Sequence, residues 1–162
     1  DQCLALLVMT FIPDAPQAVK EMRRVTRPGG VVATAMWDTA GGNDLNDSLW
    51  EAALPFDANA PQEKDQPGSY GSAEELSSLW ASAGLKNIEV KNIGFECGFD
   101  SFDDLWQPLT EGQGPAGAYL RGISDDHRMA VRNRLRQNLL GNRADGPFAL
   151  RAKAWAVRGV VP

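Results

Sequence analysis

The sequence predicts an α/β fold in which helices pack on a sheet, and three features of its N-terminal part indicate this. Two apolar runs, residues 3–12 and 31–38, have the length and composition of buried strands. An amphipathic helix lies between them, starting at Asp14 and stopping at residues 27–30. Strand, crossover helix and strand in this order form the unit from which parallel sheets are built.

Signals at both ends define this first helix. Asp14 is placed to accept a hydrogen bond from a first-turn amide, and Pro16 is tolerated because those amides have no partner within the helix. Pro28 disfavours helical geometry at the residue before it, and the two glycines after it can adopt positive φ, so the chain can reverse into the next strand. The apolar stripe expected to face the sheet consists of Val19, Met22 and Val25.

Residues 39–99 predict a helix, a loop, a second helix and a strand. The first helix is expected around residues 45–54, and the proline- and glycine-containing segment 55–70 reads as a loop. Ser72 and Glu75 have the spacing of a capping box, and an apolar helical stripe follows as far as Gly84. Residues 88–99 alternate in two phases, which predicts a strand with a bulge near Asn92.

The remaining residues predict two more helices and a last strand. One helix begins at Ser101, and a glycine-rich link separates it from a helix that Ser124 caps and Gly141 ends. Residues 148–157 read as the last strand, with apolar side chains at the even-numbered positions and Arg151 and Lys153 pointing the other way.

Size, charge and cysteine content bound the class of protein. A chain of 162 residues with a net charge of −5 is expected to form a single domain, residues 1–162, that does not bind nucleic acid; the arginine-rich segment 121–143 reads as a solvated helix face. No apolar run approaches the about 20 residues that span a bilayer, so no membrane partner and a cytoplasmic location are expected. Cys3 and Cys97 lie in apolar surroundings and read as buried free thiols, and no metal-ligand spacing is present.

One glycine motif matches a nucleotide-binding pattern but has the wrong context. Residues 112–117 read Gly-x-Gly-x-x-Gly, a pattern that binds a pyrophosphate only between a buried strand and a helix. Here it follows an expected helix, and Gly114 precedes a proline. We therefore predict a flexible connector rather than a donor site.

The sequence offers no anchor for hydrolase or kinase chemistry. His127 is the single histidine and stands among acidic residues in the first turn of an expected helix, which favours a surface position. A nucleophile elbow, a paired-carboxylate signature and a phosphate-binding loop are absent from the sequence. No catalytic residue is assigned.

Several segments resemble class I S-adenosylmethionine-dependent methyltransferases of the type 11 kind. The residues that carry the resemblance are Phe11-Ile12-Pro13-Asp14, Glu21-Met22-Arg23-Arg24-Val25 and Pro28-Gly29-Gly30, which resemble the fourth strand, the following helix and the fifth strand. Residues 152–157 resemble the final, antiparallel strand of that family. The resemblance implies a Rossmann-like sheet of order 3-2-1-4-5-7-6, of which this chain supplies strands 4, 5, 6 and 7 with flanking and capping helices.

The resemblance also implies a cofactor and site residues. S-adenosylmethionine would be the methyl donor in the intact protein, with Leu4, Ala5 and Leu6 near its methionine end, and a small molecule would be the acceptor. Trp37 and Asp38 would border the acceptor pocket, a position that the rule for ligands at the carboxyl ends of strands supports independently. For Leu4, Ala5 and Leu6 we favour core packing, and for Trp37 core packing and acceptor contact weigh equally.

The family's glycine-rich donor loop and ribose-binding acidic residue are not found in this chain, and Asp1 stands directly at an apolar strand. The domain is therefore expected to be an N-terminally incomplete fragment without strands 1–3, inactive alone. Its first strand would then be a sheet edge, and we expect self-association through Leu4, Leu6 and Val8. Two other interpretations remain open: an interaction or dimerisation module that reuses half of the fold, and a complete but divergent enzyme.

Overall fold

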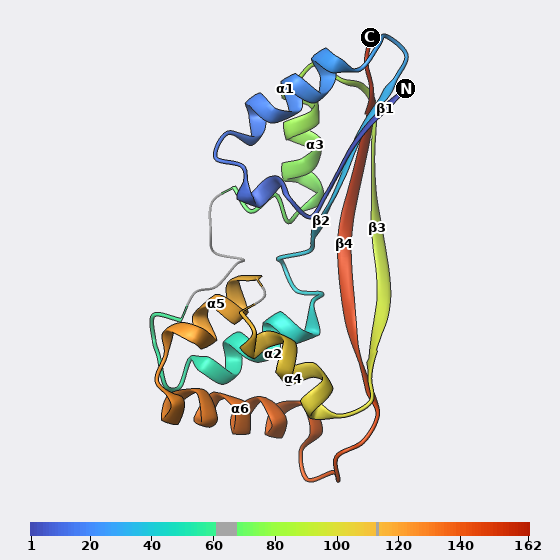
Figure 1. The fold of residues 1–162 in the computed structure, drawn as a ribbon. Helices are drawn as coiled ribbons and strands as arrows, with labels where there is room; N and C mark the ends of the chain where they lie inside the picture. The colour runs from blue at the N-terminus through green and yellow to red at the C-terminus, as the bar shows by residue number, and fades with distance from the viewer. Residues whose placement is uncertain (61–67, 113) are drawn as a thin grey trace. The chain divides into compact units, whose positions relative to one another are not determined.

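The computed structural model describes residues 1–60, 68–112 and 114–162 (Figure 1). In chain order its elements are β1 (Gln2–Leu6), the 3₁₀ helix η1 (Met9–Phe11), α1 (Ala15–Val25), β2 (Val31–Trp37), α2 (Asp44–Ala53), α3 (Ala73–Ser82), β3 (Lys86–Phe99), α4 (Phe102–Thr110), α5 (Gly114–Gly122), α6 (Asp125–Leu140) and β4 (Phe148–Val160).

The chain divides into two compact units. Among the described residues, the first comprises 1–42, 68–95 and 153–162, and we call it the sheet unit. The second comprises 43–60, 96–112 and 114–152, and we call it the helical unit. The long strands β3 and β4 each contribute residues to both units.

The sheet has the strand order β1-β2-β4-β3. β1 runs parallel to β2, with Leu4 beside Ala33, and β2 runs antiparallel to β4. β3 and β4 are also antiparallel, because Arg158 pairs with Glu89 at 2.6 Å whereas the earlier residue Lys153 lies beside the later residue Gly94. The predicted α/β fold class is confirmed, and the order equals the 4-5-7-6 part of the order that the resemblance implies.

The first strand is shorter than the apolar run that predicted it. β1 ends at Leu6, and Leu7 adopts a positive φ of 52° while its amide still donates to the carbonyl of Ala35 at 2.8 Å. The chain then turns into η1, which buries Met9. The apolar residues after Leu6 therefore serve a turn rather than a longer strand.

The predicted start and stop of α1 are confirmed. The Asp14 carboxylate accepts from the amide of Gln17 at 2.9 Å, and Gly29 adopts a φ of 78° after the helix ends. The expected place of Val25 in the buried stripe is wrong, since it is 64% exposed. Thr26 is buried in its place, with its hydroxyl donating to the carbonyl of Met22 at 2.7 Å.

The core of the sheet unit lies on one face of the sheet, where α1 and α3 pack (Figure 1). The even-numbered residues of β2 are buried on this face, and the indole of Trp80 on α3 donates to the carbonyl of Val32 at 2.9 Å. The predicted capping box is present in part: the Ser72 hydroxyl accepts from the amide of Glu75 and donates to its carboxylate. The buried members of this core are Met9, Ala15, Val19, Val32, Met36, Leu76, Leu79, Trp80, Ala83, Leu85, Val157 and Val161.

The opposite face of the sheet, which we call the outer face, carries exposed apolar side chains. Leu4 is 67% exposed and Leu6 is 71% exposed. Phe95 on β3 is also exposed, and the odd-numbered residues of β2 are half-buried. Among the described residues of the sheet unit, both helices that pack on the sheet are on the core face.

The helical unit has a core of its own, formed by α2, α4, α5 and α6 together with residues 96–99 of β3 and 148–152 of β4. Ser101, where a helix was expected to begin, and the predicted cap Ser124 each accept a hydrogen bond from a first-turn amide. The rings of Phe99 and Phe148 stack at 5.4 Å. Its buried members are Leu49, Trp50, Ala52, Ala53, Ala60, Phe102, Leu105, Trp106, Leu109, Ala116, Leu120, Val131, Leu135, Leu140 and Leu150.

Three further segments can be compared with the expectations from the sequence. The predicted phase change in β3 is present, since Ile88 and Val90 are half-buried at even positions and Cys97 and Phe99 at odd ones. Residues 55–60 form turns after α2, as predicted, whereas residues 61–67 of the expected loop lie outside the described residues. β4 extends to Val160, three residues beyond the predicted end.

Candidate functional site

The carboxyl ends of β1 and β2 lie side by side because the two strands are parallel, with Leu6 beside Ala35. Ligands of open α/β sheets bind at such ends, where loops rather than strands continue the chain. The residues at this place are Leu7 and Val8 after β1, and Trp37 and Asp38 at the end of β2.

Trp37 is half-buried on the outer face, where its ring meets that of Phe95 from β3. The ring centroids are 6.1 Å apart and the planes are tilted by 40°. Phe95 is 45% exposed, and Ile93 on the same strand is 48% exposed. The rings of Trp37 and Phe95 therefore adjoin an exposed apolar side chain and form an open apolar surface. The sequence alone does not indicate Phe95, because its partner Trp37 stands 58 positions away and only the strand order brings the two together.

Asp38 is buried and shapes the turn that follows β2. Its amide donates to the carbonyl of Lys153 at 2.9 Å, and its carboxylate accepts from the amide of Ala40 at 3.0 Å. A carboxylate that is 8% exposed and already accepts a backbone hydrogen bond fixes the direction of the chain after Trp37.

A loop before α3 lies against this turn. The amide of Thr39 donates to the carbonyl of Gly71 at 3.2 Å, and the hydroxyls of Thr39 and Ser69 are 3.5 Å apart. A side chain at Gly71 would collide with that of Thr39, so only glycine permits this approach. The loop therefore places polar groups, among them the Ser69 hydroxyl, beside the end of β2.

The residues proposed for the donor divide between the two faces of the sheet. Ala5 is half-buried and packs against the core of the sheet unit, as expected. The preference for core packing is wrong for Leu4 and Leu6, which are mostly exposed because β1 is an edge strand and their side chains are on the outer face. Cys3 and Cys97 are both free thiols, as expected, but each is half-buried rather than fully buried.

The glycine-rich segment 112–117 follows a helix, as predicted, but it is not a connector throughout. Gly114 has a φ of 64° and begins α5, while Gln113 lies outside the described residues. A Cβ at Gly117 would lie 2.5 Å from the carbonyl carbon of Gly112, so the small residue permits a close approach of the backbone. The expected glycine-rich link between helices is thus wrong over α5.

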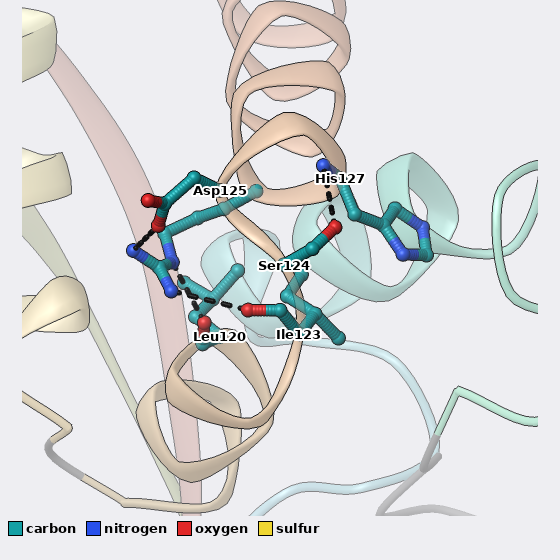
Figure 2. Close-up of polar contacts among 6 residues, drawn as sticks. Leu120, Ile123, Ser124, Asp125 and His127 are labelled. Atoms are coloured by element: carbon teal, nitrogen blue, oxygen red, sulfur yellow. Dashed lines mark hydrogen bonds and ion pairs between the residues drawn. The ribbon is translucent and has the colours of Figure 1, made fainter.

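His127 is half-buried rather than on the surface. Its ring contacts that of Phe56, with centroids 5.8 Å apart, and its Nε2 atom has no hydrogen-bond partner within the described part of the chain. Figure 2 shows its surroundings at the start of α6. Arg128, next to it, donates to the carbonyls of Leu120 and Ile123 and pairs with Asp125. These contacts hold the turn between α5 and α6.

Titratable groups elsewhere supply little that is suited to chemistry. Within residues 1–60, 68–112 and 114–162, no three histidine, cysteine, aspartate or glutamate side chains gather as a metal site would require. Burial raises the pKa of the Tyr119 phenol, and the nearby Asp57 carboxylate raises it further. No helix over the described ranges is long and apolar enough to cross a bilayer.

Comparison with known proteins adds the context of the fold. No protein-family model matches the chain. A crystal structure from Bacillus halodurans C-125, described provisionally as a methyltransferase, is similar over 99% of this chain and 64% of its own, with a TM-score of 0.50 and 14% identity. The YcgJ protein from Bacillus subtilis is similar over 99% of this chain and 63% of its own, with a TM-score of 0.47 and 15% identity.

A third similar structure is phosphoethanolamine N-methyltransferase 2 of Haemonchus contortus, in complex with phosphomonomethylethanolamine and S-adenosylhomocysteine. It matches 100% of this chain and 33% of its own, with a TM-score of 0.46 and 16% identity. The chain thus spans less than two thirds of the length of each of these structures. The strand order and the likeness to the Bacillus halodurans structure together show that this chain has the fold of the class I methyltransferases.

Proposed function

We propose that this chain is part of an enzyme that transfers a methyl group from S-adenosylmethionine to a small-molecule acceptor. The observation that carries the proposal is the place of β4, the last strand of the chain, which enters antiparallel to β2 and stands between β2 and β3. This order is the one that the family resemblance implies.

In this proposal the donor lies over the carboxyl end of β1, near Leu4, Ala5 and Leu6. The donor would supply an activated methyl group: an acceptor lone pair would form the new bond to the methyl carbon as the methyl–sulfur bond breaks, the sulfur would keep the bonding electrons, and any acceptor proton would leave to water. Because the sulfonium is already activated, holding donor and acceptor in line supplies most of the rate enhancement.

The acceptor would bind at the end of β2. The ring pair of Trp37 and Phe95 offers an apolar surface, and Asp38 holds the turn that presents it. This assigns Trp37 an acceptor contact and Asp38 a positioning role. In the intact enzyme, we expect Phe95→Ala to raise the acceptor KM more than it lowers kcat, because the ring binds without taking part in bond formation.

We further propose that the chain is a fragment that does not bind the donor alone. Its one Gly-x-Gly-x-x-Gly segment stands between α4 and the start of α5, not after a strand. Calorimetric titration of the 162-residue chain with S-adenosylhomocysteine should give no heat of binding. Tight binding would contradict this proposal and would favour a complete, divergent enzyme.

The coding DNA upstream of the Asp1 codon tests the methyltransferase proposal itself. An open frame that encodes a strand, a glycine-rich loop and an acidic residue after the next strand would support it. An in-frame start codon close to Asp1 would contradict it.

We place the intact enzyme in the cytoplasm, a reducing compartment in which the free thiols of Cys3 and Cys97 would persist.

One observation favours an alternative function, a non-catalytic interaction or dimerisation module. The exposed apolar side chains of β1 stand at a sheet edge, where backbone groups are open to another strand. The alternative predicts that the chain associates without binding the donor. The methyltransferase proposal instead predicts that the upstream coding sequence encodes a strand, a glycine-rich loop and an acidic residue.

A further inference from the structure

Lys153 on β4 is half-buried, whereas the other lysines that the structure describes are exposed. Its side chain is packed against two glycines of the sheet unit. A Cβ at Gly42 would lie 2.7 Å from Cδ of Lys153, and a Cβ at Gly94 would lie 3.9 Å from its Cγ. The stem of Lys153 is therefore held against backbone, which restricts its ammonium group more than that of a solvated lysine.

Lys153 stands at the point along β4 where the core of the sheet unit ends. Odd-numbered residues of β4 share one face, and Trp155 and Val157 on this face pack in that core, whereas Arg151 is exposed. The amide of Asp38 donates to the carbonyl of Lys153 at 2.9 Å, so Lys153 lies beside the carboxyl end of β2. Open α/β sheets bind ligands at such strand ends.

The cations of β4 differ in whether they have a partner. Arg151 pairs with Asp44 at 3.2 Å, and Arg158 pairs with Glu89 at 2.6 Å. Both arginines are exposed. The Lys153 ammonium makes no hydrogen bond or ion pair with any residue that the structure describes. The most buried cation of the strand is thus the one whose charge is not neutralised.

The turn after β2, residues 38–42, adds hydrogen-bond donors beside Lys153. The amides of Gly41 and Gly42 donate no hydrogen bond within the described part of the chain, and Gly42 is one of the residues against which the lysine stem packs. The carboxylate of this turn, that of Asp38, is 8% exposed and accepts from the amide of Ala40. An ammonium group and free amides, with the nearby carboxylate already engaged, form a set of donors for an anion.

We infer that Lys153 and the turn 38–42 bind an oxyanion, namely the carboxylate or phosphate group of a small molecule. The ammonium group donates a charge-assisted hydrogen bond to one oxygen, and the glycine amides are donors for the others. Trp37 pairs with Ala154, the next residue of β4, so the ring of Trp37 and the side chain of Lys153 are on opposite faces of the sheet. The anion site is therefore separate from the proposed acceptor surface and does not depend on methyl transfer.

Amide NMR of the unmodified chain, titrated with inorganic phosphate and separately with acetate at constant ionic strength, tests the inference. We expect the amide shifts of residues 39–42 and of Lys153 to change and to saturate. Saturation by phosphate alone would support a phosphate ligand, and saturation by acetate alone would support a carboxylate. No saturable change in this turn with either anion would overturn the inference. The titration uses neither methyl donor nor acceptor, so its outcome is separate from that of the coding-DNA test.

Two pairs of variants separate the charge of Lys153 from its position, and the same spectra report whether each variant is folded. Lys153→Met removes the charge and should weaken binding of the anion at least about tenfold, whereas Lys20→Met, at an exposed position of α1, should bind as the unmodified chain does. Gly42→Ala keeps the charge but displaces the lysine stem and should also weaken binding, whereas Gly98→Ala, with open space around it, should not. Undiminished binding by Lys153→Met or Gly42→Ala, or an equal loss in either control, would overturn the inference.

Discussion

Two buried threonines of the sheet unit should respond to the same substitution with opposite sign. Thr34 on β2 is 4% exposed, and its hydroxyl has no hydrogen-bond partner among the described residues. Thr26 at the end of α1 is 6% exposed, and its hydroxyl donates to the carbonyl of Met22 at 2.7 Å. Valine has nearly the shape of threonine, so each substitution removes little more than the hydroxyl.

The magnitudes follow from the cost of burying a polar group. A buried hydroxyl without a partner costs roughly 1–3 kcal/mol, so Thr34→Val should raise the free energy of unfolding by about 1 kcal/mol. A satisfied hydroxyl contributes about 1 kcal/mol net, so Thr26→Val should lower the free energy by about that amount. The two variants should therefore differ by about 2 kcal/mol, which corresponds to several degrees in Tm for a chain of this size.

Urea unfolding followed by circular dichroism measures the difference through the transition midpoint. The slope of the transition should stay constant in both variants, because neither changes the surface exposed on unfolding. If Thr34→Val destabilises the protein as much as Thr26→Val does, the Thr34 hydroxyl has a partner in solution and the reasoning is refuted.

Three further predictions concern the helical unit. Burial raises the pKa of Tyr119 in the folded protein, so its neutral phenol contributes fully to stability below the unfolded-state pKa of about 10, and this contribution is lost as the pH rises through the folded-state pKa. The urea midpoint of Tyr119→Phe should therefore fall less between pH 8 and pH 11 than that of the unmodified chain. Arg128→Met removes two hydrogen bonds from a charged donor to backbone carbonyls and should cost about 2 kcal/mol, whereas Asp125→Asn, which breaks only the exposed ion pair, should cost under about 1 kcal/mol by the same denaturation assay. Gly117→Ala forces a Cβ against backbone atoms and should lower the free energy of unfolding by about 1–3 kcal/mol, while Gly122→Ala, in the same helix with open space around it, should leave stability unchanged or raise it slightly; equal effects would refute the packing argument.

Local signals predicted the elements that depend on local chemistry. Asp14, Ser72 and Ser124 were identified as caps from residue type and spacing alone, and each accepts the expected amide hydrogen bond. A cap needs only a short polar side chain beside the first turn, and both lie within a few residues of one another. The same is true of Gly29, whose positive φ follows from the residue type.

Features that depend on distant packing could not be predicted in this way. α5 was missed because its glycines and Pro115 lower helix propensity, although proline is tolerated in a first turn and Gly117 is fixed by the backbone packed against it. The exposure of Leu4 was missed because an apolar strand residue is buried only if something covers its face of the sheet. Phe95 joined the candidate site only through the strand order.

The candidate acceptor surface at the end of β2 and the exposed leucines of β1 are on the same face of the sheet. Leu4 stands beside Ala33, and Ala33 and Trp37 are four residues apart on β2, so their side chains point to the same side. Since the ring of Phe95 meets that of Trp37, the outer face joins the apolar surface at the end of β2 to the apolar edge at β1. A segment that packs over the outer face would therefore cover the ring pair of Trp37 and Phe95 and would exclude an acceptor from it.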